Sequence, residues 1–176
     1  MINEIDYDTV GTDTAEFIEL YNPGTTAYSL SGVAVVLVNG ANSLAYLSIP
    51  LSALGTLAPG EYVVIGSSSV VGALPTGTRS ITFASAQDNV QNGAPDAVAL
   101  VTGMTTVIDS VSYEGVTTWN ADAGVTLTLS EGPSDGGPED NNTTAGSIGR
   151  SPNGRDTDDN SADFRFGPAT PGAANP

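Results

Sequence analysis

Short hydrophobic runs separated by turn residues are the dominant pattern along the chain. Valine, isoleucine, threonine and tyrosine gather in these runs, which suits the half-buried surface of a β-sheet. The runs predict about eight to ten short strands, near Ile2–Tyr7, Glu16–Tyr21, Val33–Asn39, Ala45–Ile49, Tyr62–Ile65, Arg79–Phe83, Ala97–Val101, Val107–Tyr113, Val125–Leu129 and Phe164–Phe166. No segment keeps the apolar spacing of a helix for the roughly 10–12 residues that a helix needs. We therefore expect an all-β protein.

Turn-forming residues lie between the predicted strands. Asn22-Pro23-Gly24 and Ala58-Pro59-Gly60 supply positive or fixed φ angles. Many short strands with turns between them are typical of a β-sandwich or barrel. Three stretches fall outside this pattern: Ser67–Leu74, expected as a mobile loop; a long acidic loop near 130–145; and 169–176, expected as a C-terminal strap or the start of a linker.

Two strand positions predict contacts inside the core. Val33–Val38 is continuously apolar, which predicts a central strand covered on both faces. Asp109 alternates with Val107 and Val111, so regular pleating places its carboxylate on an apolar face. A buried carboxylate needs a partner, and Arg150 or Arg155 is the candidate. The alternative is a β-bulge that turns Asp109 outward.

Charge narrows the range of partners. The chain has 176 residues, which fits a single domain over 1–176 with its own hydrophobic core. It carries 20 Asp and Glu against 4 Arg and no Lys, a net charge of −16. Proteins that bind nucleic acid neutralise phosphates with Lys and Arg, and the same argument opposes an anionic membrane surface. We therefore expect neither direct nucleic-acid binding nor membrane binding.

Histidine and cysteine are both absent. Their absence excludes Ser-His-Asp and Cys-His nucleophile systems, disulfides, and zinc sites with His or Cys ligands. The lack of cysteine, the acid surplus and the many small residues favour an exported bacterial module, either secreted or at the cell surface. Met1 is followed directly by a predicted strand, so we expect a module of a larger protein with no leader of its own.

A series of short motifs carries a resemblance to a known family. In chain order they are Ile2-Asn3-Glu4-Ile5, Glu16–Gly24, Leu30-Ser31-Gly32, Leu57–Val64, Val107–Tyr113, Ser147–Arg150, Asn153–Thr157 and Thr170–Asn175. The series resembles a bacterial lamin-tail domain over nearly the whole chain. The resemblance implies an immunoglobulin-like β-sandwich that serves as a non-catalytic appendage of a secreted or surface protein, often beside a nuclease or other hydrolase domain. The chain is longer than the family pattern in Val38–Leu57 and Gly115–Ala145.

The first acidic cluster lies on a predicted strand–loop–strand hairpin. It consists of Glu4, Asp6, Asp8, Asp13 and Glu16. Like charges held close together are costly unless a cation neutralises them, and Ca²⁺ binds carboxylate and carbonyl oxygens. The cluster therefore suits calcium as a cofactor. The alternative is an acidic hairpin tip that is open to water.

A second acidic cluster has the spacing with which a calcium-binding EF-hand loop begins. Asp156, Asp158 and Asn160 alternate as such a loop requires, but Ser161 and Gly167 occupy the positions of its glycine and bidentate glutamate. The alternative is a turn held by side chains that bond their own backbone, which we favour over a metal site. A third acidic group, Glu131, Asp135, Glu139 and Asp140, predicts a solvated loop.

Aromatic residues and paired carboxylates raise two further functional hypotheses. Trp119, with Tyr113 and Tyr62, suits a platform for stacking a sugar, but a lone Trp is more often a loop anchor or a core residue. Paired carboxylates can run glycoside hydrolysis or metal-assisted phosphoryl chemistry, yet no cluster of positive groups is present to support a phosphate reaction. We expect a non-catalytic binding or positioning module whose partners are neighbouring domains, a protein or a glycan. A calcium-stabilised carbohydrate-binding or adhesion module is the alternative, followed by a metal-dependent hydrolase.

Overall fold

The computed structural model describes residues 1–121, 124–132 and 139–176, and within them fourteen strands and two short α-helices. One sheet has six strands in the order β14 (Phe164–Gly167), β13 (Ser147–Arg150), β1 (Ile2–Asp6), β2 (Phe17–Tyr21), β7 (Tyr62–Gly66) and β8 (Arg79–Thr82). A second sheet has the order β10 (Thr106–Tyr113), β9 (Asp96–Thr102), β4 (Val33–Asn39) and β5 (Leu44–Pro50). Two small hairpins pair β11 (Thr118–Ala121) with β12 (Val125–Thr128), and β3 (Tyr28–Ser29) with β6 (Thr56–Leu57).

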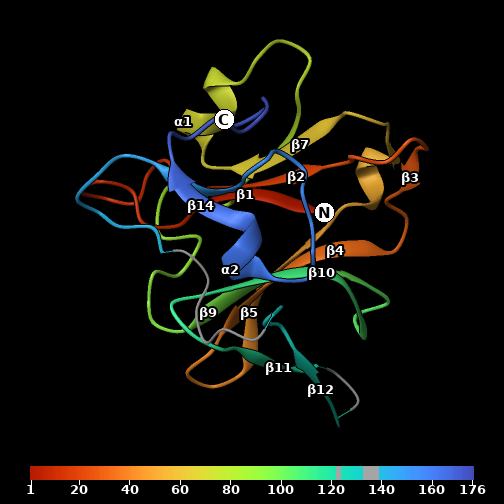
Figure 1. Cartoon of the computed structure of the whole chain (residues 1–176), viewed down its shortest axis with the longest axis vertical. Coiled ribbons are helices and arrows are strands. Elements are labelled where there is room, and N and C mark those ends of the chain that lie inside the picture. The colour runs from red at the N-terminus through yellow and green to blue at the C-terminus, as the bar shows by residue number, and fades with distance from the viewer. Residues whose placement is uncertain (122–123, 133–138) are drawn as a thin grey trace.

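The two large sheets pack face to face as a β-sandwich (Figure 1). Alternation along each strand places one set of side chains between the sheets. The shared core includes Ile18 and Ile65 from the six-stranded sheet and Val35, Leu37 and Val98 from the other, all fully buried. The all-β, immunoglobulin-like sandwich expected from the sequence is thus confirmed.

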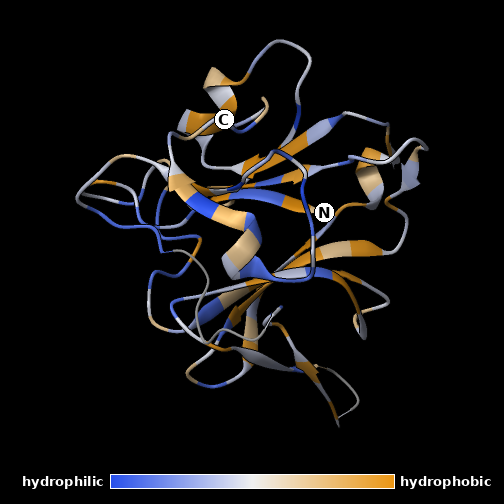
Figure 2. Cartoon of the chain, in the orientation of Figure 1, coloured by the Kyte–Doolittle hydropathy of each residue, from blue (hydrophilic) through white to orange (hydrophobic). Residues whose placement is uncertain are grey.

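The central strand β4 is buried on both faces, as its continuous apolar run predicts. Val35 and Leu37 face the core between the sheets, whereas Val36 and Val38 face a second apolar cluster. The hairpin of β11 and β12 covers that second cluster and forms a third layer below the four-stranded sheet (Figure 1). Figure 2 shows hydrophobic residues concentrated on the strands, with more hydrophilic colouring in the connecting loops.

Ser67–Leu74, expected as a mobile loop, instead contains helix α1 (Ser68–Ala73). The reason lies in sheet topology, because β7 and β8 pair in parallel and parallel neighbours need a crossover connection, usually helical. Val70 packs on Phe17 and Val64 on the outer face of the six-stranded sheet. A single buried valine in a six-residue helix leaves no periodic signal for sequence reasoning to detect.

The ten predicted strands all occur, and four further strands explain the higher number. These are β3 and β6, which are two residues long, and β11 and β13. β13 contains Gly149, whose missing side chain leaves room for Asn175. Helix α2 (Asn160–Asp163) was likewise not predicted.

Asp109 forms the buried ion pair that the sequence offered as one alternative, although a bulge is also present beside it. The register between β9 and β10 shifts between Val107 and Asp109, which marks a bulge. The carboxylate nevertheless remains buried and pairs with Arg150 at 3.0 Å. The bulge therefore positions the carboxylate for its partner.

The C-terminal residues lie as a strap against the six-stranded sheet. Thr170 donates its backbone N–H to the carboxylate of Glu4 at 2.7 Å, and Gly172 donates to Glu19 at 2.6 Å. Asn175 donates to the backbone carbonyl of Asn3 at 3.0 Å. Two buried glutamates on β1 and β2 thus hold the strap in place.

Among the helices of the described ranges, none has the length and apolar character needed to cross a bilayer.

Candidate functional site at the acidic loop end

The five carboxylates of the first cluster do not meet at one point. Glu4 lies under the C-terminal strap, where Thr170 and Ser147 donate to it. Glu16 accepts from the backbone N–H groups of Asn89 and Val90, each at 2.8 Å. These two glutamates are therefore structural acceptors on separate parts of the fold.

The remaining three acids of this cluster lie near the loops at one end of the sandwich. Asn92 donates its side-chain amide to both Asp8 and Asp13, at 3.2 Å in each case. Asp6 is 7% exposed and is the last residue of β1. Within residues 1–121, 124–132 and 139–176, no three acidic side chains are arranged as a preformed metal centre. The calcium prediction for this cluster stays a prediction.

Asp156 and Asn160 of the second cluster, and the neighbouring Asp159, take part in contacts that hold the local structure. Asp156 lies 3.3 Å from Arg150 and accepts the backbone N–H of Asp158. Asn160 donates its amide to the carbonyl of Ser110 at 3.0 Å. Asp159 caps helix α2. This geometry is consistent with the turn alternative.

The third acidic group differs in part from the solvated loop that the sequence predicts. Asp140 is buried and accepts from the backbone of Tyr7 at 3.1 Å. Glu131 accepts from the backbone of Ser110 at 3.1 Å. Glu139 is exposed, and Asp135 lies outside the described residues. The physical reason is that these carboxylates satisfy backbone N–H groups that the strands leave free.

Trp119 is a core residue, so it does not offer the exposed stacking surface that a sugar platform requires. The side chain is 3% exposed and packs in the cluster beneath the four-stranded sheet. Tyr113 is also fully buried, and its ring stacks on Tyr7 with 4.1 Å between centroids. The core alternative for Trp119 therefore describes its environment.

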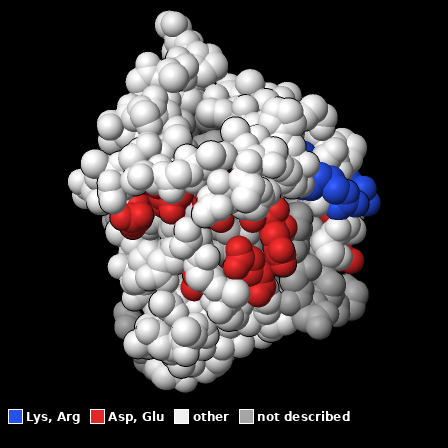
Figure 3. Space-filling view, turned by 90° about the vertical axis from the view of Figure 1, so that its left-hand side faces the viewer, with Lys and Arg blue, Asp and Glu red and all other residues white. Residues whose placement is uncertain are grey.

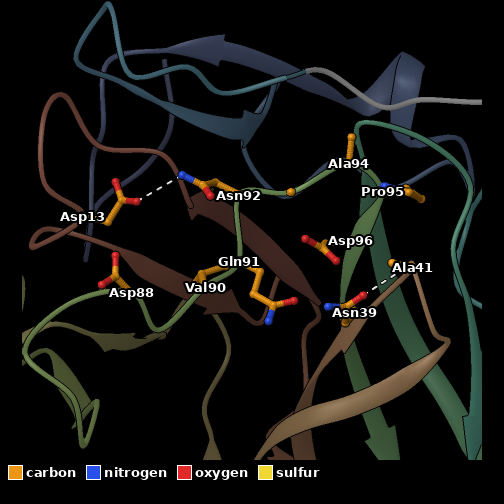
Figure 4. A pocket seen from close by; sticks show the side chains of 11 residues that line it. Asp13, Asn39, Ala41, Asp88, Val90, Gln91, Asn92, Ala94, Pro95 and Asp96 are labelled. Carbon is orange, nitrogen blue, oxygen red and sulfur yellow. Dashed lines mark hydrogen bonds between the residues drawn. The ribbon is translucent and has the colours of Figure 1, made fainter.

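A polar pocket of about 380 Å³ lies at the same loop end (Figure 4). It is lined by Asp13 from the loop between β1 and β2, by Asn39 and Ala41 at and just after the end of β4, by residues 88 and 90–95 of the loop before β9, and by Asp96 at the start of β9. Figure 4 shows Asp13 and Asp88 on one side, Asn39 and Asp96 on the other, and Gln91 between them. The pocket is thus built by loops that are distant in sequence.

The polar atoms of the pocket are mainly hydrogen-bond acceptors. Asp96 accepts from the backbone of Gly40 at 3.1 Å, and burial raises its pKa to about 6. Burial also raises the pKa of Asp13. The amide oxygen Oε1 of Gln91 is buried and has no hydrogen-bond partner in the part of the chain that the structure describes. Such a set of acceptors favours a cationic or hydrogen-donating group.

The four arginine side chains contact groups that do not line the pocket. Arg79 pairs with Glu61 at 2.8 Å, and Arg150 is buried between the sheets. Arg155 lies 3.5 Å from Asp163, while Arg165 donates to the carbonyl of Ser161. Figure 3 shows acidic side chains gathered on the side of the molecule that carries the loop end, with positive side chains only at one edge. The loop end therefore presents a negative surface.

Sequence reasoning missed most of this pocket. Asp88, Gln91 and Asp96 were not among the candidate residues, because they follow no motif and are brought to Asp13 only by the fold. One available signal was Asn92-Gly93, a turn dipeptide in a polar stretch between two strands. Such a dipeptide predicts a loop, but it does not predict which residues the loop packs against.

Comparison with known proteins identifies the family. A family model described as Lamin Tail Domain matches residues 1–115, whereas no curated protein matches the chain. The match includes β1 to β10 and every residue that lines the polar pocket, and it leaves out β11 to β14. It agrees with the motif resemblance over most of the chain, except for the motifs between 147 and 175. The chain therefore belongs to the lamin tail domain family, whose members are immunoglobulin-like and generally non-catalytic modules.

Proposed function

We propose that the chain is a non-catalytic binding or positioning module of a larger exported bacterial protein, and that its acidic loop end contacts a cationic surface of a neighbouring domain or partner protein. The family assignment supports a module without catalytic activity. The absence of histidine and cysteine from the sequence supports the same role, because the common nucleophile systems need them.

The observation that carries the proposal is the acceptor-rich pocket. Asp13, Asp88 and Asp96 line a hollow whose size suits one long side chain, and Gln91 contributes a buried oxygen without a donor. A Lys or Arg side chain brings several donors and one positive charge. The net charge of −16 would steer such a partner toward the protein before contact is made.

A peptide titration tests this proposal. A short lysine-containing peptide and a matched peptide with glutamate in place of lysine are titrated into the chain at low and high salt, with NMR shifts as the readout. We expect saturable shifts at Asp88, Gln91 and Asp96 with the lysine peptide alone, weakened at high salt. The double variant Asp13→Asn/Asp88→Asn should bind about threefold or more weakly. Equal binding of both peptides would contradict the proposal.

A matched control separates the pocket from net charge. Glu61→Gln/Glu139→Gln removes the same two charges from residues outside the pocket. It should leave the peptide affinity nearly unchanged. The non-catalytic part is tested on the purified chain with phosphodiester and glycoside substrates, and turnover that follows the chain through purification would overturn it.

A further inference from the structure

A second hollow lies on the side of the sandwich where both large sheets end. β5 is the last strand of the four-stranded sheet, and β8 is the last strand of the six-stranded sheet. Between them is a hollow of about 190 Å³, lined by residues 47–50 and 81–84. We call this region the seam. Leu47, Ile49 and Ile81 line it and pack against the core between the sheets, so the seam offers an apolar surface.

The opposite side of the sandwich is closed by side chains and by helix α2. Arg150 of β13 pairs with Asp109 of β10 at 3.0 Å, and Asn160 of α2 donates to the carbonyl of Ser110 at 3.0 Å. Figure 1 shows α2 between β14 and β10. At the seam, by contrast, three residues that line the hollow are exposed: Ser48, Pro50 and Thr82.

β5 has a free edge beside the seam. It pairs with β4 on one side, and in the part of the chain that the structure describes no strand pairs with its other side. Such an edge is a template for an added strand, and proteins commonly protect it with charged residues. The seven residues of β5 include no charged one, and Leu44 and Tyr46 are 52% and 36% exposed. β5 therefore lacks this protection.

β5 also connects the seam to the polar pocket. Tyr46 has no partner in the ladder with β4, which marks a bulge between the two regions. Its hydroxyl accepts the backbone N–H of Gln91 at 2.9 Å, and Gln91 lines the pocket. Ala41, in the turn before β5, lines the pocket as well. The loop after β8 likewise runs from Ala84 at the seam to Asp88 at the pocket.

We propose that the cationic partner binds as an extended strand along the free edge of β5, with apolar side chains in the seam and a Lys or Arg side chain in the polar pocket. This inference rests on the proposed function and names the form in which the partner presents its charge. β5, β4 and β9 are antiparallel, and the added strand continues that pattern beside residues 47–50. Its alternate side chains face the hollow, and its basic residue lies beyond the bulge.

Charge favours such a segment over a second copy of the chain. Asp13, Asp88 and Asp96 line the pocket at one end of β5, and each copy carries a net charge of −16. Pairing β5 with β5 of a second copy would bring two strongly negative molecules together and would supply no positive group to either pocket. A basic segment is attracted by the same charge.

Peptide titration separates strand addition from charge. The short lysine peptide is compared with a peptide of about ten residues in which alternating valine and threonine precede the lysine. We expect NMR shifts at residues 47–50 and 81–84 with the longer peptide alone. Its affinity should be about tenfold higher or more, because two contacts are linked. Equal affinities without shifts at residues 47–50 would overturn strand addition and leave the proposed function intact. Equal affinity of the longer peptide and its glutamate counterpart would instead overturn the proposed function and the cationic partner with it.

N-methylation of the longer peptide distinguishes strand pairing from apolar contact alone. Successive N–H groups of a strand point to opposite sides, so methyl groups on alternate nitrogens block one edge only. Of the two alternately methylated peptides, we expect one to lose the gain in affinity and the other to keep it. Equal affinity of both would overturn the proposal.

A pair of variants locates the strand on the protein. Thr82→Arg places a large side chain at the seam and should remove the gain in affinity. Thr128→Arg makes the same charge change at an exposed position of β12, outside the seam and the pocket, and should keep the gain. Equal affinity of the longer peptide for both variants would overturn the assignment. A dimer in sedimentation that the longer peptide dissociates would assign the edge to a second copy and would also overturn it.

Discussion

Arg150 on β13 lies 3.0 Å from Asp109 on β10, so a buried ion pair joins the two sheets of the sandwich. The two side chains are 0% and 2% exposed. Arg150 also lies 3.3 Å from Asp163 and donates its Nε to the carbonyl of Ile2 at 2.7 Å. Its guanidinium packs over the ring of Phe164. One arginine thus neutralises two buried acids and fixes the position of β13 relative to both sheets.

Replacing Arg150 should destabilise the protein strongly. Arg150→Met keeps the length and apolar contacts of the side chain but leaves Asp109 and Asp163 buried without their cation. We expect a loss of about 3–5 kcal/mol in the free energy of unfolding, measured by urea denaturation. Arg79→Met is the matched control, because its pair with Glu61 is partly exposed, and it should cost about 1 kcal/mol or less. Similar losses in both variants would contradict this account.

The sequence predicted the framework of the fold because its signals are local. Alternating and continuous apolar runs mark strands directly, and Val33–Val38 even indicated that both faces of its strand are covered. Asp109 was recognised because a carboxylate among valines needs a partner, and the chain has only four arginines to offer. The local pattern predicted that Asp109 is buried, and the small number of arginines limited its possible partners.

The candidate site was harder to predict because it depends on which loops meet. Tyr7 and Asp140 are far apart in the chain, and nothing local indicates that the Asp140 carboxylate accepts the backbone N–H of Tyr7. The same holds for Asp13 and Asp96 across the pocket. Trp119 has polar neighbours in the sequence, and it is buried because its hairpin packs on the four-stranded sheet. Burial set by long-range packing is not visible in a short window of sequence.

Stability should fall as the pH rises. Burial raises the pKa of Glu19 to about 8, whereas an unfolded glutamate has a pKa of about 4.3. Between these values the folded protein holds a proton that the unfolded chain releases, so the free energy of unfolding decreases with increasing pH. Asp6 and Glu131, whose pKa values burial raises to about 8, act with the same sign. We expect a higher melting temperature at pH 5 than at pH 8, measured by calorimetry with chelator present.

A substitution isolates the contribution of Glu19 to this pH dependence. Glu19→Gln is neutral at every pH, so the melting temperature should change less between pH 5 and pH 8 than in the wild type. Glu139→Gln, at an exposed position, makes the same change in net charge and shows how much of the effect comes from overall charge alone. A slope unaffected by Glu19→Gln would show that its carboxyl group is already ionised in the folded state.

The C-terminal strap should contribute measurably to stability through Asn175. Its side-chain amide donates to the carbonyls of Asn3 and Arg150, each at 3.0 Å. Asn175→Ala leaves these two carbonyls without that donor, which should cost about 1–3 kcal/mol. Removal of Pro176 alone is the control, because the hydrogen bond that its carbonyl accepts from the Ser151 hydroxyl is exposed. Chemical denaturation that gives equal stabilities for the two variants would argue against a fixed strap.

Trp119 should report on the docking of the β11–β12 hairpin. It is the single tryptophan of the chain and is 3% exposed. We expect blue-shifted emission that acrylamide quenches poorly, and a loss of about 3–5 kcal/mol for Trp119→Ala. Emission typical of a water-exposed indole would mean that the hairpin does not cover the four-stranded sheet in solution, and it would restore the platform hypothesis.

Glu16 should hold the loop that forms one wall of the polar pocket. Its carboxylate accepts from the backbone of Asn89 and Val90, each at 2.8 Å, and from the side-chain amide of Asn89 at 3.1 Å. In Glu16→Gln an amide group replaces one acceptor oxygen, so at least one of these donors loses its partner, at a cost of about 1–3 kcal/mol. We expect faster hydrogen exchange at Asn89 and Val90 and weaker binding of the lysine peptide.

Ala41→Ser, on the opposite rim of the pocket, leaves this anchor intact and should preserve exchange protection at both amides. Unchanged exchange in Glu16→Gln would mean that the loop is held by other contacts, such as the hydrogen bond from Asp88 to the carbonyl of Asp13.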